Sequence, residues 1–268
     1  MIRNVALLAA LLCAFTNITN AQTYYPTDIG NVWILESEDR TERITYAIGK
    51  TDERFDGKEG RILRITTAVL GTTTANLSTF FMQVDEDGIK LHRIFTRFGD
   101  IFGDAHVEFS PPAIFFPAVL ELQKAWEVNG KTEINLVGDV TLSSVNEVIA
   151  IEDVETPIGI FKDCVKIRVQ TKTTAALGTS RSTTYQWLAP DVGPVKFQTD
   201  QNIVFALVSS SLIPTKHPHD VNADRVVNIL DLTFVASQFG GTDPKADVNG
   251  DGTVNILDLT LVAQNIEN

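Results

Sequence analysis

Between Tyr24 and Leu212 the chain alternates apolar and polar residues in short runs that end at turn signals. A period of two places alternate side chains on one face of a strand, so these runs predict half-buried β-strands. Typical turn signals are Asp56-Gly57, Asp87-Gly88 and Asn129-Gly130. The runs are RITYAIG, RILRITTAV, STFFMQV, GIKLHRIF, TEINLVGDVTL, NEVIAIEDV, DCVKIRVQTKT, STTYQWLA and GPVKFQT.

These runs follow one another with short turns and without a long amphipathic helix between them. Such an order is typical of antiparallel sheet, because neighbouring strands can pair through hairpins. We therefore expect residues 22–212 to form an all-β antiparallel domain. A meander of this length predicts a half-barrel or a sandwich.

The segment from Pro111 to Pro117 breaks the alternation, since it is apolar but contains three prolines. Proline lacks an amide donor and therefore does not fit a central strand. We predict a loop that covers one open end of the sheet. The alternative is a lip, carrying Phe115 and Phe116, over a cavity for an apolar ligand.

The N-terminus has the pattern of a secretory signal peptide, residues 1–21. Arg3 precedes an apolar run from Val5 to Phe15, and a small-residue exit follows at Ala21. We expect cleavage after Ala21 and a secreted, extracellular protein, which a docking partner could hold at a cell surface. No other segment has the roughly 18 apolar residues that a membrane span needs.

Without the signal the chain keeps 21 basic and 34 acidic side chains, a net charge of −13. This charge argues against nucleic acid and anionic membrane surfaces as partners and suits a protein that binds cations. The mature chain has a single cysteine, Cys164, so it forms no internal disulfide. Cys164 alternates with Val165, Ile167 and Val169, which predicts a buried strand cysteine rather than a nucleophile.

The end of the chain contains nearly the same stretch twice, HDVNADRVVNILDLTFVAS and ADVNGDGTVNILDLTLVAQ, 27 residues apart. A calcium ion takes roughly six to eight oxygen ligands, and a short loop supplies them from alternate Asp and Asn side chains. Repetition at a fixed offset indicates a duplicated unit. In the second copy the predicted ligands are Asp247, Asn249, Asp251, the Thr253 carbonyl, Asn255 through a water, and Asp258.

The first copy carries the same pattern with two changes, Ala223 for Gly250 and Arg225 for Gly252. Arginine adopts the conformation required at this turn only at a cost of about 1 kcal/mol, and it adds a positive charge near the ion. We predict two calcium ions, the second bound more tightly. The first set of ligands is Asp220, Asn222, Asp224, Val226, Asn228 and Asp231.

Each loop precedes a short helix with an apolar stripe at helical spacing. We expect the two stripes to pack against each other around a pseudo-twofold axis. A unit of about 50 residues has a small core, so calcium binding and folding should be coupled. The stripes are Leu232, Val235, Ala236 and Phe239, and Leu259, Val262, Ala263 and Ile266.

These loop ligands, their spacing and the helix stripes resemble a type I dockerin, a pair of calcium-binding loop–helix repeats that lack the entering helix of an EF-hand. We assign residues 219–268 to it and residues 213–218 to a linker. The resemblance implies docking to a cohesin-type module on a scaffold protein, in assemblies that degrade polysaccharides. Loop positions 10 and 11, which help to choose the partner in that family, are Ile229 and Leu230, and Ile256 and Leu257. An intramodular core role for these pairs is the alternative.

The sheet region is similar to a group of secreted bacterial β-domains. The similarity lies in the opening Tyr24–Trp33, in the hairpin Thr156–Cys164, and in the segment Trp187–Val195. The group implies a curved antiparallel sheet and no reaction.

The sequence is compatible with three functions. The first is calcium-dependent docking with the sheet domain as cargo. The second is a glycoside hydrolase, although the acidic residues at 36–39 and 85–87 stand in turn-like contexts and no G-x-S-x-G, phosphate loop or H-E-x-x-H occurs. We therefore expect a non-enzymatic protein. The third is a β-domain that binds an apolar ligand or carbohydrate, with Trp33, Trp126 and Trp187 as platform or, in the simpler alternative, as core.

Overall fold

The fold is that of a computed structural model. It describes residues 21–73, 75–97, 104–176, 178–213, 218–222 and 227–266. Residues 1–20 of the predicted signal peptide, linker residues 214–217 and the predicted ligands Asp224 and Val226 lie outside the described residues.

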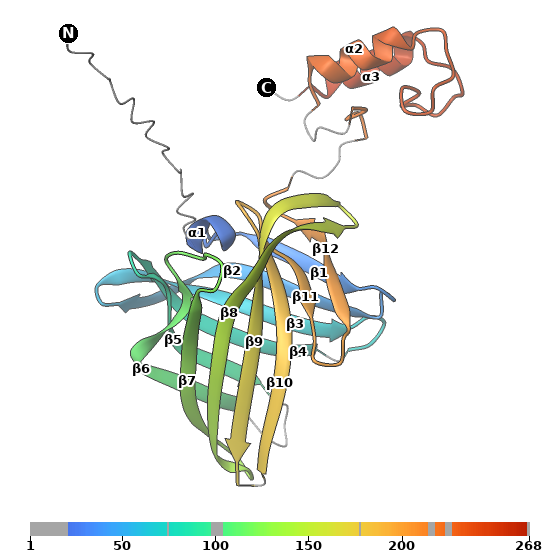
Figure 1. The fold of residues 1–268 in the computed structure, drawn as a ribbon. Coiled ribbons are helices and arrows are strands. Elements are labelled where there is room, and N and C mark those ends of the chain that lie inside the picture. Colours follow the sequence, from blue (N-terminus) through green and yellow to red (C-terminus); the bar gives the residue numbers. More distant parts are fainter. Residues whose placement is uncertain are drawn as a thin grey trace, which may run out of the picture.

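Twelve strands and three helices are present in these described ranges (Figure 1). They confirm the antiparallel all-β domain followed by a small helical module. The elements are α1 (Ala21–Tyr24), β1 (Val32–Ser37), β2 (Glu42–Phe55), β3 (Lys58–Val69), β4 (Ala75–Asp85), β5 (Gly88–Arg97), β6 (Asp104–Pro117), β7 (Ala125–Ile134), β8 (Gly138–Thr156), β9 (Gly159–Ala175), β10 (Gly178–Ala189), β11 (Gly193–Gln198), β12 (Val204–Ser210), α2 (Ile229–Ser237) and α3 (Ile256–Gln264).

The strands form one antiparallel sheet in the order β6-β5-β4-β3-β2-β1-β12-β11-β10-β9-β8-β7. Almost every strand therefore pairs with its neighbours in sequence, as a meander requires. The exception is the pairing of β1 with β12, in which Trp33 lies opposite Ser210 and joins the two ends of the domain. The sheet twists so strongly that its edge strands β6 and β7 approach each other (Figure 1). Thr132 Oγ1 of β7 donates to the His106 carbonyl of β6 at 2.6 Å, so the sheet is a near-closed barrel.

The core fills the interior of the curved sheet and includes side chains from β1, β3, β10 and β12. Trp33, Leu35, Leu63, Leu188 and Leu207 are fully buried there. Burying each of these side chains stabilises the fold by about 1.5–3 kcal/mol. Together they hold the two halves of the curved sheet in contact.

The three tryptophans lie in or beside this core rather than on an open platform. Trp33 and Trp187 are buried, and Trp126 is partly buried. Each indole N–H has an acceptor: the Val192 carbonyl for Trp33, the Glu152 carboxylate at 2.7 Å for Trp187, and the Phe115 carbonyl at 3.0 Å for Trp126. The three tryptophans therefore pack in or against the core, as the simpler alternative predicts.

The segment from Pro111 to Pro117 is the end of strand β6, and the predicted loop is wrong. Two features reconcile the prolines with a strand. β6 is an edge strand, so one side of its backbone needs no partner in the sheet. The pairing with β5 also shifts between Leu91 and Arg93, whose partners are Ala113 and Glu108, so the bulge leaves Pro111 and Pro112 outside the ladder.

Cys164 is buried in β9, as its alternation with apolar residues predicts. Burial, reinforced by the charge of Asp153, raises the pKa of its thiol to about 12. A thiol in this state carries little thiolate at neutral pH, which is consistent with a packing role.

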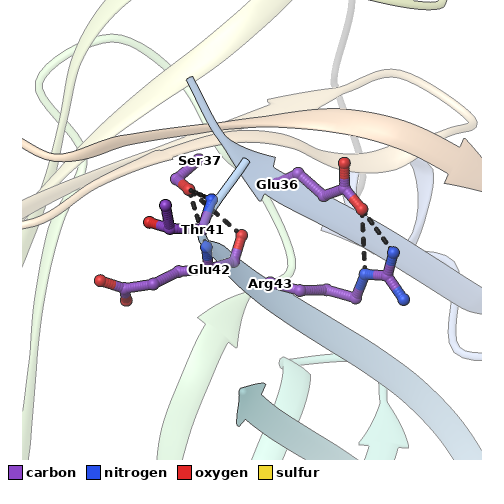
Figure 2. A network of polar contacts seen from close by, with 5 residues as sticks. All are labelled: Glu36, Ser37, Thr41, Glu42 and Arg43. Carbon is purple, nitrogen blue, oxygen red and sulfur yellow. Dashed lines mark hydrogen bonds and ion pairs between the residues drawn. The ribbon is translucent and has the colours of Figure 1, made fainter. Parts of the chain in front are cut away.

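Of the acidic residues at 36–39 and 85–87, Glu36, Asp39, Asp85 and Asp87 hold turns or form ion pairs. Figure 2 shows the β1–β2 turn, where Ser37 Oγ accepts from the amides of Thr41 and Glu42 at 3.2 and 2.9 Å, and Glu36 pairs with Arg43 at 2.5 Å. Asp39 accepts from Ser37 Oγ at 2.6 Å, and this bond is the main reason that its pKa is lowered. These contacts indicate that Glu36 and Asp39 stabilise the β1–β2 turn.

The β4–β5 hairpin is organised in the same way. Lys90 lies 2.9 Å from Asp85 and 2.8 Å from Asp87.

No described helix is long and apolar enough to cross a membrane.

Candidate metal centre and docking face

Helices α2 and α3 are each preceded by an N-cap asparagine at the ninth position of the predicted loop. Asn228 Oδ1 accepts from the Leu230 amide at 2.7 Å, and Asn255 Oδ1 accepts from the Leu257 amide at 2.8 Å. Both residues have extended backbone angles, which is typical of an N-cap. The loop sequence therefore also determines where each helix starts.

The aspartates at position 12 complete a capping box in both copies. Asp231 Oδ2 accepts from the Asn228 amide at 2.9 Å, and Asp258 Oδ2 accepts from the Asn255 amide at 2.8 Å. Their other oxygens reach back to the start of the loop, to the amides of Asn222 at 3.1 Å and Asn249 at 3.2 Å. Both carboxylates are fully buried, so each links the two ends of its loop.

The second loop folds around Asp247. Its carboxylate accepts from the amides of Gly250 and Gly252, each at 2.8 Å, and of Asp251 at 3.1 Å. Gly250 and Gly252 have φ angles of +74° and +87°, which glycine adopts freely. The equivalent positions in the first copy, Ala223 and Arg225, lie outside the described residues.

The predicted side-chain ligands of the second loop converge on one another. Asp251 Oδ2 accepts from the side-chain amides of Asn249 at 2.9 Å and Asn255 at 3.3 Å, and Asn255 Nδ2 also donates to the Thr253 carbonyl at 3.0 Å. The hydrogen bond from Asn249, followed by that from the Thr253 amide, lowers the pKa of Asp251. Asp251 is therefore ionised at neutral pH.

The oxygen atoms of the second loop are suitable ligands for a hard divalent cation. They are carboxylate, carboxamide and carbonyl oxygens at alternate loop positions, which calcium prefers. Within the described residues no three His, Cys, Asp or Glu side chains form a metal-binding cluster by themselves. The arrangement depends on Asn249, Asn255 and the Thr253 carbonyl as well as on aspartates.

In the first copy, Asp220 is buried and Asn228 and Asp231 occupy the same roles as their equivalents in the second copy. Asn222 contributes its amide to Asp231.

The two helices enclose a small common core, but its members differ from the predicted stripes. Val235 and Val262 are buried as expected. Ala236, Ala263 and Phe239 are exposed, the last by 57%. The remaining buried positions come from the loops: Val227, Ala246 and Val254. The stripes are partly wrong because each helix is only nine residues long, so Phe239 lies beyond the end of α2, and because residues that precede the helices take part in the core.

The residues at loop positions 10 and 11 are exposed in both copies. Ile229 and Ile256 are each 63% exposed, and Leu230 and Leu257 are 59% and 57% exposed. A core role for these pairs within the module is therefore wrong. They form two equivalent apolar patches, each directly after an N-cap asparagine.

Residues 218–267 match the family described as the dockerin type I domain. The C-terminal segment is a type I dockerin domain. Type I dockerin domains typically bind calcium, and the match implies docking to a cohesin and suggests an extracellular location. The dockerin match begins one residue before the boundary predicted from the sequence.

Residues 103–210 match a family described as DUF3108-like. The match runs from the start of β6 to the end of β12 and includes two of the three segments on which the predicted similarity of the sheet region depends. The third, Tyr24–Trp33, precedes it.

Two solved structures are similar to this chain. One is a candidate lipoprotein from Parabacteroides distasonis, with 15% identity, a TM-score of 0.44, and coverage of 72% of this chain and 99% of the other. The second is a candidate exported protein with a YmcC-like fold from Bacteroides fragilis, with 14% identity, a TM-score of 0.43, and coverage of 70% and 99%. No curated protein matches the chain.

Proposed function

We propose that this chain is a secreted protein that its dockerin domain attaches, in the presence of calcium, to a cohesin-type module of a scaffold protein. The assembly would be extracellular and related to polysaccharide degradation, with the β-domain as cargo. The observation that carries the proposal is the position of the exposed pairs Ile229-Leu230 and Ile256-Leu257 beside the loop ligands Asn228 and Asn255.

The capping contacts explain why docking would depend on calcium. Ile256 and Leu257 are the first two residues of α3, and the Leu257 amide is held by Asn255. Asp258, on the same turn, is bonded to both ends of the loop. Neutralising the clustered aspartates with a cation would fix this turn, and with it the direction of the two apolar side chains. An exposed apolar pair on a fixed frame is the kind of surface that a partner protein can cover.

We propose two ions per chain, with the second loop binding more tightly. The positive φ angle of Gly252 supports this order, because the equivalent residue in the first loop is Arg225. Arginine would adopt such an angle with strain and would place a cation beside the site.

We also propose that the β-domain has no glycosidase activity. Hydrolysis of a glycoside needs two carboxyl groups that flank the bond to be cleaved. Glu36, Asp85 and Asp87 are instead engaged by Arg43 and Lys90. A screen with chromogenic glycosides tests the proposal, and turnover that survives further purification would contradict it.

Docking is tested by affinity capture from the native secretome on the immobilised full chain, with and without a calcium chelator. We expect a cohesin-containing scaffold protein to be retained with calcium and lost with chelator. Replacing all four residues of the two exposed pairs with serine should abolish capture and leave calcium binding intact. Ile160→Ser is the matched control, because Ile160 is equally exposed, at 59%, but lies on β9. Capture that is insensitive to both the chelator and the fourfold variant would overturn the proposal.

A further inference from the structure

The β-domain contains a cavity of about 410 Å³ between the two halves of its curved sheet. This volume lies within the range of roughly 300–1,000 Å³ that is typical of small-molecule sites. One wall comes from β2 to β6 and is mainly apolar: Ile44, Ile65, Phe80, Ile94, Phe115 and Phe116. Tyr25 closes this wall, with its ring stacked on Phe116 at a centroid distance of 4.9 Å.

The opposite wall has a different chemistry. There, β8, β9 and β10 contribute Ser144, Asn146, Thr171, Thr184 and Gln186 to the cavity. The register makes these residues neighbours, since Ser144 pairs with Thr171, and Asn146 and Thr184 both pair with Val169. We call these five residues the polar stripe.

The protein itself supplies few hydrogen-bond partners for the side chains of the polar stripe. In the part of the chain that the structure describes, the side chains of Ser144, Thr171, Thr184 and Gln186 make no hydrogen bond, and Asn146 makes one long contact, 3.4 Å, to the Trp126 carbonyl. The hydroxyls of Tyr25 and Tyr46, at the other wall, are also without a protein partner there. Among the described residues only Arg61 Nε is a buried side-chain atom without a partner, so the polar atoms of the stripe are accessible from the cavity and can bond to a molecule inside it.

The lining also restricts the charge of an occupant. None of the described residues that line the cavity is charged. Placing an ionised group in such a site without an opposite charge is costly, which excludes a buried carboxylate, phosphate or ammonium. A sugar is disfavoured as well, because hydroxyls on nearly every carbon would face the phenylalanine and isoleucine wall without partners.

We propose that this cavity binds a neutral lipid: a hydrocarbon chain against the wall of β2–β6, with hydroxyl or ester oxygens bonded to the polar stripe. Glycerol monoesters of fatty acids have this chemistry. The inference concerns the β-domain alone and is independent of docking.

The first experiment uses the full mature chain and the fluorescent probe N-phenyl-1-naphthylamine. We expect saturable binding of the probe and its displacement by 1-oleoylglycerol, whereas cellobiose and xylobiose leave it bound. Absence of saturable probe binding, or displacement by the sugars but not by 1-oleoylglycerol, would overturn the proposal. Neither result would affect the docking proposal, because chelator-sensitive capture is measured separately.

Two variants on adjacent residues of β9 locate the site. Val169 faces the cavity and Gln170 is exposed on the other face. Val169→Trp narrows the cavity and should weaken probe binding at least roughly tenfold, whereas Gln170→Trp should leave it unchanged. Equal effects of the two variants, with both shown to be folded by circular dichroism, would place the probe elsewhere and contradict the proposal.

A third variant tests the polar stripe. Gln186→Leu removes a hydrogen-bonding group but keeps a similar volume. We expect roughly threefold to tenfold weaker binding of 1-oleoylglycerol with little change for the probe, which carries no ester. Equal or tighter binding of 1-oleoylglycerol would show that its oxygens do not contact the stripe. The wild-type displacement measurement is decisive even if a variant fails to fold.

Discussion

The β-domain and the dockerin domain are stabilised in different ways. The β-domain buries large side chains such as Trp33, Leu63 and Phe205 between strands that are far apart in sequence. Within the described residues of the dockerin domain, the fully buried apolar side chains are four valines and one alanine, and the buried charged side chains are Asp220, Asp231 and Asp258. Five small side chains bury little apolar area, and clustered carboxylates repel one another. From this contrast we expect the dockerin domain to depend on a cation for its stability, whereas the β-domain should be stable through its own core.

Removal of calcium should produce the largest difference between the dockerin domain and the β-domain. With excess chelator we expect the amides of Asn249, Gly252 and Asn255 to lose their protection from hydrogen exchange, while those of β3 and β9 keep it. The physical reason is the repulsion among Asp247, Asp251 and Asp258 once no cation neutralises them. Hydrogen exchange with mass spectrometry measures both regions at once. Equal protection of the dockerin domain with and without calcium would contradict the comparison.

The converse experiment truncates a side chain in the hydrophobic core of the β-domain and leaves the dockerin domain unchanged. Leu63 of β3 is fully buried, so Leu63→Ala should lower the free energy of unfolding of the β-domain by about 2–5 kcal/mol. Calcium affinity should not change. Chemical denaturation and calorimetric titration measure the two quantities. Val69→Ala on the same strand is the control, because Val69 is 42% exposed and its truncation should cost less than about 0.5 kcal/mol.

Within the dockerin domain, Asp258→Asn tests the dual role of the position-12 carboxylate. The change removes the negative charge of the Asp258 carboxylate. This carboxylate accepts hydrogen bonds from the amides of Asn249 and Asn255 and is a predicted calcium ligand. Hydrogen bonds to charged groups contribute about 1.5–3 kcal/mol, so we expect roughly a tenfold to hundredfold weaker second site. Isothermal titration with calcium measures it. An unchanged second site would show that Asp258 acts only as a helix cap.

The smallest expected effect comes from Arg225→Gly in the first loop. Glycine adopts the positive φ angle of this loop position more easily than arginine and removes the charge, so we expect the first site to tighten by about 1 kcal/mol, roughly fivefold. The same titration should then show two sites of more similar affinity. If the first site is already the tighter one in the unaltered chain, the predicted order is wrong.

The sequence predicts local features well where a single short segment determines them. The ligand spacing from Asp247 to Asp258 is such a case, since a twelve-residue loop folds back on itself and its neighbours in sequence become neighbours in space. Strands such as DCVKIRV are another, because a period of two specifies both the strand and its buried face. The capping of each helix by Asn228 and Asn255 follows from the same local logic, because the ninth loop residue directly precedes the helix.

Other features depend on which distant segments meet, and only the tertiary structure decided them. The pairing of β1 with β12 sets the sheet order and leaves β6 at an edge, which is why Pro111 and Pro112 are tolerated in a strand. The exposure of Ile229 and Ile256 depends on how α2 packs against α3, and the stripe rule misassigned Ala236 and Phe239 for the same reason. The cavity has walls from strands about 100 residues apart, so no local pattern could reveal that Phe80 and Gln186 line the same cavity. Periodicity specifies the face on which a side chain lies, and the closure of the sheet determines what that face encloses.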